Sequence, residues 1–206
     1  MDITKLLDSL HIKSNNTQLI SQAFIHRSFL NESKQLLISN ERLEFLGDSI
    51  LSFLTSLFLY NSYPESEEGA LTNIRSSLVK TSTLAEAAQT LHLGDYLKLS
   101  KGEEESGGRN NVSLLADTFE AFLGAIYLSS DLDTVQTLLS TCLFPKLDSI
   151  MENKTYKDAK SLFQEIIQEE TKVSPLYKVL KEDGPDHAKH FLIGVFVGQK
   201  KCGEGS

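Results

Sequence analysis

The chain has 206 residues, of which 40% are hydrophobic, enough for one sizeable core or for a core and a small second unit. This composition excludes collagen-like, Pro-rich and low-complexity proteins. The net charge of −8 is uneven, because residues 1–150 carry 11 Lys and Arg against 19 Asp and Glu, whereas residues 151–206 carry 9 of each. An acidic total argues weakly against a nucleic-acid ligand and suits a cation, so bulk charge leaves the ligand open.

Residues 3–150 have helical periodicity almost throughout. Apolar residues recur every three or four positions over 17–30, 41–60, 69–91 and 113–130. Pro, Gly and Asn cluster at 61–69, 92–96 and 100–111, and these segments are predicted as breaks, with 102–111 as a flexible connector. The first residues do not read as a signal peptide, and the longest apolar stretch, 49–63, is shorter than the roughly 20 residues that span a bilayer. We therefore expect a cytoplasmic protein without a membrane segment, with Cys142 and Cys202 as free thiols.

The predicted helix at 41–60 begins with ERLEFLGDSIL, in which Glu41, Glu44 and Asp48 share one edge of an otherwise apolar helix. A second pair, Asp117 and Glu120, lies three residues apart in LLADTFEAFLGAIYL. Like charges at these spacings repel, and more so in dry surroundings.

Two interpretations of these acids remain open on spacing alone. The acids can be solvated residues on helix surfaces, or the two helices can pack side by side and present oxygen ligands to a hard cation, Mg²⁺ or Mn²⁺. A glycine follows each acidic group, Gly47 and Gly124, and would allow the close helix contact that the second interpretation needs.

The pattern changes after residue 150. Residues 151–157 are polar and are predicted as a linker, followed by an amphipathic helix at 159–171 and two strands at 175–184 and 190–200. We expect domains at 1–150 and 158–206, the first helical and the second a small α+β unit.

The segment NERLEFLGDSIL (40–51) resembles the signature of the ribonuclease III family of double-stranded-RNA endonucleases. AFIHRSF (23–29), PESEEGALTNIRSSLV (64–79), the stretch at 83–109 and SLLADTFEAFLGAIYLSSD (113–131) continue the likeness in the family's order. The resemblance implies a mainly α protein, an all-helical endonuclease domain followed by a double-stranded-RNA-binding domain. It also implies a homodimer in which each site cuts one strand.

The resemblance implies a role for each acid. Glu44, Asp117 and Glu120 would bind the metal, and Asp48 would act with Glu120 in catalysis. Glu41 and Glu68 match acidic positions near the active-site valley and the dimer contact. His26, in FIHRSF, is interpreted as a hydrogen-bonded structural residue rather than a ligand.

Residues 158–205 resemble the family's RNA-binding domain, which recognises A-form shape through the minor groove. By position, Gln164, Glu165, Gln168 and His187 would contact RNA. In the family, the stretch that matches GEGS continues into a lysine-rich helix, and we expect this chain to be truncated before that helix. A version extended through it is expected to bind double-stranded RNA more tightly and with a steeper salt dependence.

The expected function is Mg²⁺-dependent cleavage of double-stranded RNA, in ribosomal RNA precursors and other structured transcripts. The products would carry 5′-phosphate and 3′-hydroxyl ends with short 3′ overhangs. Two alternatives are a non-catalytic RNA-binding protein of the same fold, which the loss of an acid would mark, and a helical hydrolase of small phosphorylated substrates. All six acids are present, and the chain has no phosphate-binding loop of P-loop type.

Overall fold

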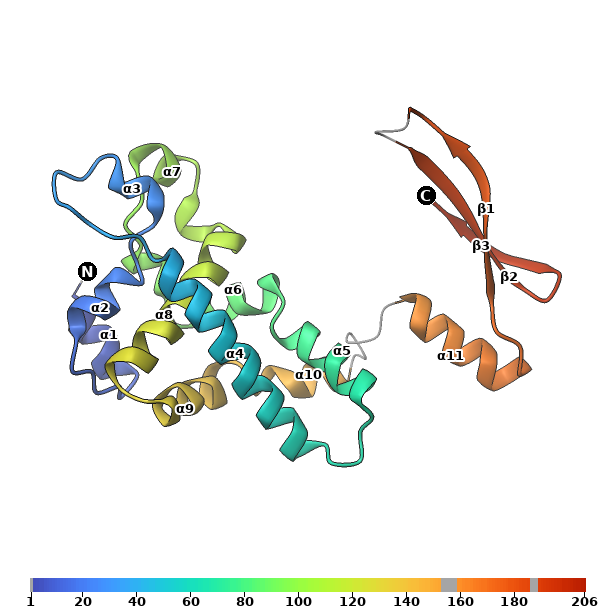
Figure 1. Cartoon of the computed structure of the whole chain (residues 1–206), viewed down its shortest axis with the longest axis horizontal. Coiled ribbons are helices and arrows are strands. Elements are labelled where there is room, and N and C mark those ends of the chain that lie inside the picture. Colours follow the sequence, from blue (N-terminus) through green and yellow to red (C-terminus); the bar gives the residue numbers. More distant parts are fainter. Residues whose placement is uncertain (1, 153–158, 186–188) are drawn as a thin grey trace. The chain divides into compact units, whose positions relative to one another are not determined.

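The computed structural model describes residues 2–152, 159–185 and 189–206, without the side chains of residues 159, 161, 162 and 165. The chain divides into two compact units, Met1–Tyr156 and Lys157–Ser206, each with its own internal contacts (Figure 1).

The first unit is helical. Its described elements are α1 (Ile3–Ser9), α2 (Thr17–Gln22), α3 (Arg27–Leu30), α4 (Glu41–Ser62), α5 (Glu68–Leu78), α6 (Thr81–Thr90), η1 (Leu93–Tyr96), α7 (Lys101–Glu105), η2 (Gly108–Asn110), α8 (Val112–Ser129), α9 (Leu132–Cys142) and α10 (Lys146–Glu152). Helices α4 and α8 pack against each other more extensively than any other pair, and α6 and α2 also pack on α8. The predicted helical domain is confirmed.

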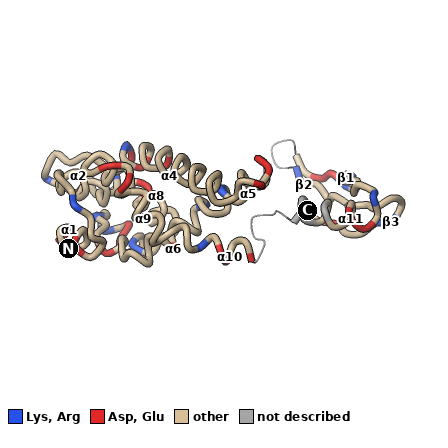
Figure 2. Tube along the Cα trace, turned by 90° about the horizontal axis from the view of Figure 1, so that it is seen from below, with Lys and Arg blue, Asp and Glu red and all other residues tan. Residues whose placement is uncertain are grey.

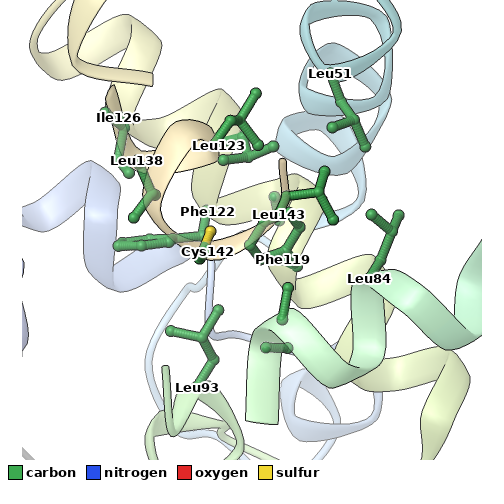
Figure 3. Packing of buried hydrophobic residues seen from close by; sticks show 14 of the residues in the cluster. Leu51, Leu84, Leu93, Phe119, Phe122, Leu123, Ile126, Leu138, Cys142 and Leu143 are labelled. Carbon is green, nitrogen blue, oxygen red and sulfur yellow. The ribbon is translucent and has the colours of Figure 1, made fainter. Parts of the chain in front are cut away.

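The core surrounds α8. Large side chains from five elements are fully or almost fully buried there (Figure 3). They include Leu51 of α4, Leu84 of α6, Leu93 of η1, Phe119 and Phe122 of α8, and Leu139 of α9. Apolar contact on most of its faces makes α8 the central helix of this unit.

Two predicted helices are divided. The expected helix at 17–30 breaks between α2 and α3, because His26 has an extended conformation and Ile25 forms an isolated parallel bridge with Lys98. The expected helix at 69–91 breaks between α5 and α6, where Lys80 has an extended conformation.

The segment 102–111, predicted as a flexible connector, instead contains helical turns. Ser100 caps α7 through a hydrogen bond from the Glu103 N–H, and η2 follows. The Arg109 guanidinium then donates to the carbonyl oxygens of Leu97 (2.8 Å) and Gly94 (3.1 Å), while its Nε lies 2.7 Å from Glu104. These bonds give the segment a fixed conformation that turn-forming residues alone did not indicate.

Helices α4 and α8 have the length and apolar composition of membrane-spanning helices. This is weak evidence for a membrane, because the core helices of water-soluble domains share both properties, and the most apolar window of α8 is 61% buried.

The second unit consists, in its described part, of α11 (Ala159–Thr171) and the strands β1 (Leu176–Asp183), β2 (His190–Val197) and β3 (Lys200–Gly205). The strands form an antiparallel sheet in the order β1-β2-β3. The helix and the first two strands were predicted. β3 was missed because KKCGEG has no alternation of apolar and polar residues.

Candidate metal centre

Two glycines allow α4 and α8 to approach each other closely. A Cβ atom on Gly47 would lie 1.8 Å from the backbone oxygen of Glu120, and one on Gly124 would lie 2.3 Å from the backbone oxygen of Leu43. Any larger residue at either position would push the helices apart. The predicted glycine contact is confirmed, and it brings together the stretches that carry the acids (Figure 2).

Three carboxylates converge at this contact. Glu44 of α4 and Asp117 and Glu120 of α8 each offer one oxygen atom within 4.8 Å of the others, and all three side chains are half-buried. A group of carboxylate oxygens suits a hard divalent cation such as Mg²⁺ rather than zinc, which prefers nitrogen and sulfur. The residues therefore fit the metal that the family resemblance implies.

The electrostatics of the cluster favour a cation. Burial raises the pKa of Glu120 to about 8, and the nearby charges of Asp48, Asp117 and Glu44 add to the rise. Burial also raises the pKa of Glu44, with further contributions from Asp117, Glu41 and Asp48. A bound cation would reverse these penalties, because it stabilises the ionised form of each carboxylate.

Asp48 and Glu41 flank the cluster on α4. Asp48 is exposed, one helical turn after Glu44, and its charge acts on both Glu44 and Glu120. The exposed Glu41 accepts a hydrogen bond from the Ser39 hydroxyl (2.8 Å) and lies 3.7 Å from the Arg27 guanidinium. Both acids are thus neighbours of the cluster, outside the group of three.

A cavity of about 400 Å³ opens beside the cluster. Its walls include Glu41, Glu44 and Asp117, together with His26, Arg27 and Asn40. His26 was predicted as a hydrogen-bonded structural residue, and its Nδ1 does bond to Ser28. Spacing along the chain does not indicate that His26 also faces this cavity, because 91 positions separate it from Asp117.

Glu68 lies elsewhere in the unit. It is the first residue of α5 and accepts a hydrogen bond from the Thr72 hydroxyl at 3.0 Å. It lines a second, largely apolar cavity of about 750 Å³ with Phe53, Leu57 and Tyr60 of α4. The expectation that Glu68 lies near the active-site valley and the dimer contact stays a prediction.

The four predicted RNA contacts belong to the second unit. Gln164 is half-buried on α11 and Gln168 is exposed one turn later. The Glu165 side chain and the whole of His187 lie outside the described residues. Their role in RNA binding stays a prediction.

The chain matches two family descriptions, Ribonuclease-III-like over residues 16–147 and the double-stranded RNA binding motif over residues 159–206. It is 43% identical over 204 residues to Ribonuclease 3 of Borreliella afzelii, covering 98% of this chain and 83% of that relative. It is 41% identical over 203 residues to Ribonuclease 3 of Listeria monocytogenes, with 98% and 88% covered.

Solved structures show the same fold. The nuclease domain of ribonuclease III from Campylobacter jejuni is 35% identical with a TM-score of 0.64, covering 70% of this chain and 99% of that one. Dicer from Pichia stipitis is 28% identical with a TM-score of 0.51, covering 92% and 84%. With its acidic cluster, its two units and these relatives, the chain belongs to the ribonuclease III family of double-stranded-RNA-specific endoribonucleases.

Proposed function

We propose that the chain cleaves double-stranded RNA in a Mg²⁺-dependent reaction that leaves 5′-phosphate and 3′-hydroxyl ends. The observation that carries this proposal is the half-buried cluster of Glu44, Asp117 and Glu120, with Asp48 beside it. Mn²⁺ is expected to replace Mg²⁺, because it accepts the same oxygen ligands.

In the proposed mechanism Glu44, Asp117 and Glu120 hold the metal. When bound, Mg²⁺ polarises the phosphate and lowers the pKa of a nearby water. Asp48 accepts a hydrogen bond from the attacking water and keeps it in line with the P–O3′ bond. As the water oxygen bonds to phosphorus, Asp48 takes up the proton that the water loses. The P–O3′ bond breaks, and a solvent water protonates the leaving 3′ oxygen.

A homodimer with two such sites would cut both strands and leave a short 3′ overhang. Phe53 and Tyr60 of α4 are 55% and 71% exposed, although each is a large apolar side chain. Together with Leu57 they form an open apolar wall of the 750 Å³ cavity, and we propose that a second copy of the chain covers it. The Campylobacter jejuni structure concerns structural flexibility in a region that is involved in dimer formation of the nuclease domain.

The second unit is proposed to bind the RNA duplex. Its match to the double-stranded RNA binding motif supports contacts from Gln164, Glu165, Gln168 and His187 to the minor groove. Ribosomal RNA precursors and other structured transcripts are the proposed substrates. A cytoplasmic location is proposed because both cysteines, Cys142 and Cys202, are free thiols.

One assay tests the mechanism. Long double-stranded RNA is incubated with the chain, with and without Mg²⁺, and the ends are mapped. We expect cleavage that stops on chelation and falls by at least about a thousandfold in an Asp48→Asn, Glu120→Gln double variant, since loss of one preorganised electrostatic group already costs about 100- to 1,000-fold.

The matched control carries the same two kinds of substitution at exposed acids of the same unit, Glu105→Gln and Asp148→Asn. It should cleave at the unmodified rate. Cleavage that survives chelation, or that persists in the Asp48/Glu120 variant, would contradict the mechanism.

A further inference from the structure

His26 is held in one orientation at the wall of the 400 Å³ cavity. Its backbone N–H donates to the Lys98 carbonyl oxygen (3.1 Å), next to the bridge between Ile25 and Lys98. Its ring nitrogen Nδ1 lies 2.8 Å from the Ser28 hydroxyl and accepts a bond from the Ser28 N–H at 3.3 Å. Backbone and side chain are therefore both fixed.

This network assigns the position of the ring proton. The Ser28 hydroxyl oxygen accepts a hydrogen bond from the Ser100 N–H (3.0 Å), so its own proton is free to point to Nδ1 of His26. With Nδ1 accepting from both groups of Ser28, the neutral imidazole carries its proton on Nε2. The Nε2–H group has no hydrogen-bond partner among the described residues.

The cavity offers few other donors. The Thr118 hydroxyl donates to the carbonyl oxygen of Leu114 at 2.6 Å, and the Asn40 amide donates to that of Ala23 at 3.2 Å. Arg27 is strongly exposed and faces Glu41. The rest of the polar wall is carboxylate, so an anion entering this cavity would be repelled unless a cation offsets these charges.

His26 is also close to the cluster. Burial raises the pKa of the Asp117 carboxyl, and the positive charge that the His26 ring carries when protonated acts in the opposite direction. The two residues line one cavity from different elements, since His26 precedes α3 and Asp117 lies on α8.

We propose that His26 donates its Nε2–H to a non-bridging oxygen of the RNA phosphate that enters this cavity, and so orients the phosphate beside the carboxylate cluster. This inference rests on the proposed metal-dependent cleavage of RNA. A preorganised N–H donor suits the task, because it does not have to reorient when the anion enters the cavity.

Two substitutions separate this role from the structural one. His26→Asn keeps an acceptor near the position of Nδ1, and Asn is a favoured residue before a helix, but it removes the donor at Nε2. His26→Gln keeps an N–H near the position of Nε2 but removes the capping acceptor. His92→Asn is the matched control, because His92 is exposed and lies outside the cavity walls.

Three quantities are measured for each variant: Tm, kcat/KM for a short RNA duplex with Mg²⁺, and the affinity for that duplex by fluorescence anisotropy with Ca²⁺ in place of Mg²⁺. For His26→Asn we expect an unchanged Tm, with kcat/KM and affinity each at least about tenfold lower, the lower range for a hydrogen bond to a charged group. For His26→Gln we expect a lower Tm with much of the affinity and kcat/KM retained.

The opposite pattern would overturn the proposal. If kcat/KM and affinity follow Tm, so that Gln is the more harmful substitution, His26 is a structural cap only. Unchanged kcat/KM and affinity in His26→Asn would also overturn it. Failure of the unmodified chain to cleave would instead contradict the proposed function, and the anisotropy arm would still decide the role of His26.

Discussion

The two ends of α4 are built in opposite ways. Its first half packs closely on α8 through Gly47, yet the edge of that contact carries Glu44 in half-buried surroundings. Its second half turns large apolar side chains such as Phe53 and Tyr60 toward open space beside α5. The first half places charge in half-buried surroundings, and the second half leaves apolar side chains exposed along a cavity.

Each arrangement is unfavourable for an isolated chain, and each indicates a different missing partner. Confined carboxylates are stabilised by a cation, whereas exposed apolar surface is stabilised by a second protein surface. The same helix therefore connects the proposed metal site to the proposed dimer contact. Substitutions in each half of α4 should therefore affect the proposed metal site and the proposed dimer contact separately.

The largest effect is expected for Gly47→Ala. The new Cβ would meet the Glu120 backbone oxygen at 1.8 Å, so the helices must separate and the carboxylates with them. Unfolding free energy should fall by about 3 kcal/mol or more, and Tm by about 6–12 °C, with loss of cleavage. Thermal unfolding and the RNA assay measure both.

Gly69→Ala is the control, because a Cβ there has no neighbour within 4 Å. Removing an exposed glycine from α5 should instead stabilise the unit by about 0.5–1 kcal/mol. Equal Tm changes for the two alanines would contradict the close-contact explanation.

At the other end of α4, Phe53→Glu should weaken the homodimer. The new carboxylate would lack the apolar contacts of Phe53, and burying it at the interface would cost free energy of desolvation. The dissociation constant of the dimer should therefore rise by about 30-fold or more, which is the effect of one strong interface residue. Sedimentation velocity over a concentration series measures the change. Leu128→Glu places the same charge at another exposed apolar position, on α8, and should leave the dimer intact.

The carboxylate cluster predicts that the stability of the unit depends on pH. Because the folded-state pKa of Glu120 is raised to about 8, the folded protein holds its proton more tightly than the unfolded chain. In the presence of a chelator, stability should therefore fall as pH rises from about 4.5 to 8. Mg²⁺ should remove most of this loss, and its affinity should rise with pH over the same range.

Thermal unfolding from pH 5 to 8, with chelator and with Mg²⁺, tests this dependence. Glu120→Gln should flatten the curve measured with chelator, because the group that titrates is gone. A curve that keeps its slope in this variant would assign the effect to other acids.

The smallest effect is expected where the two halves of α4 meet. The fully buried Thr55 hydroxyl has no hydrogen-bond partner within the described part of the chain. Thr55→Val should raise the unfolding free energy by about 1 kcal/mol and Tm by about 2–4 °C, because it removes an unsatisfied polar group.

Thr118→Val makes the same substitution on α8, where the hydroxyl donates to the Leu114 carbonyl oxygen. It should give no such gain in Tm. Equal gains for the two valines would indicate greater apolar burial rather than removal of an unsatisfied hydroxyl.

Spacing along the chain predicted the parts of the site that lie on two regular helices. Glu44 and Asp117 belong to strongly periodic segments, and Gly47 marked the contact that joins them. Contacts between distant segments were not predictable in the same way. The bridge at Ile25, the carbonyl contacts of Arg109 and the orientation of His26 depend on neighbours that adjoin only in the fold.

The glycine contact between α4 and α8 also fixes how long each acidic side chain must be. Because one backbone lies against the other, the helices cannot move closer to compensate for a shorter carboxylate. Replacing Glu120 by Asp would keep the charge but withdraw its oxygens by about 1.5 Å, one carbon–carbon bond. At position 120 the length of the side chain is therefore constrained as well as its charge.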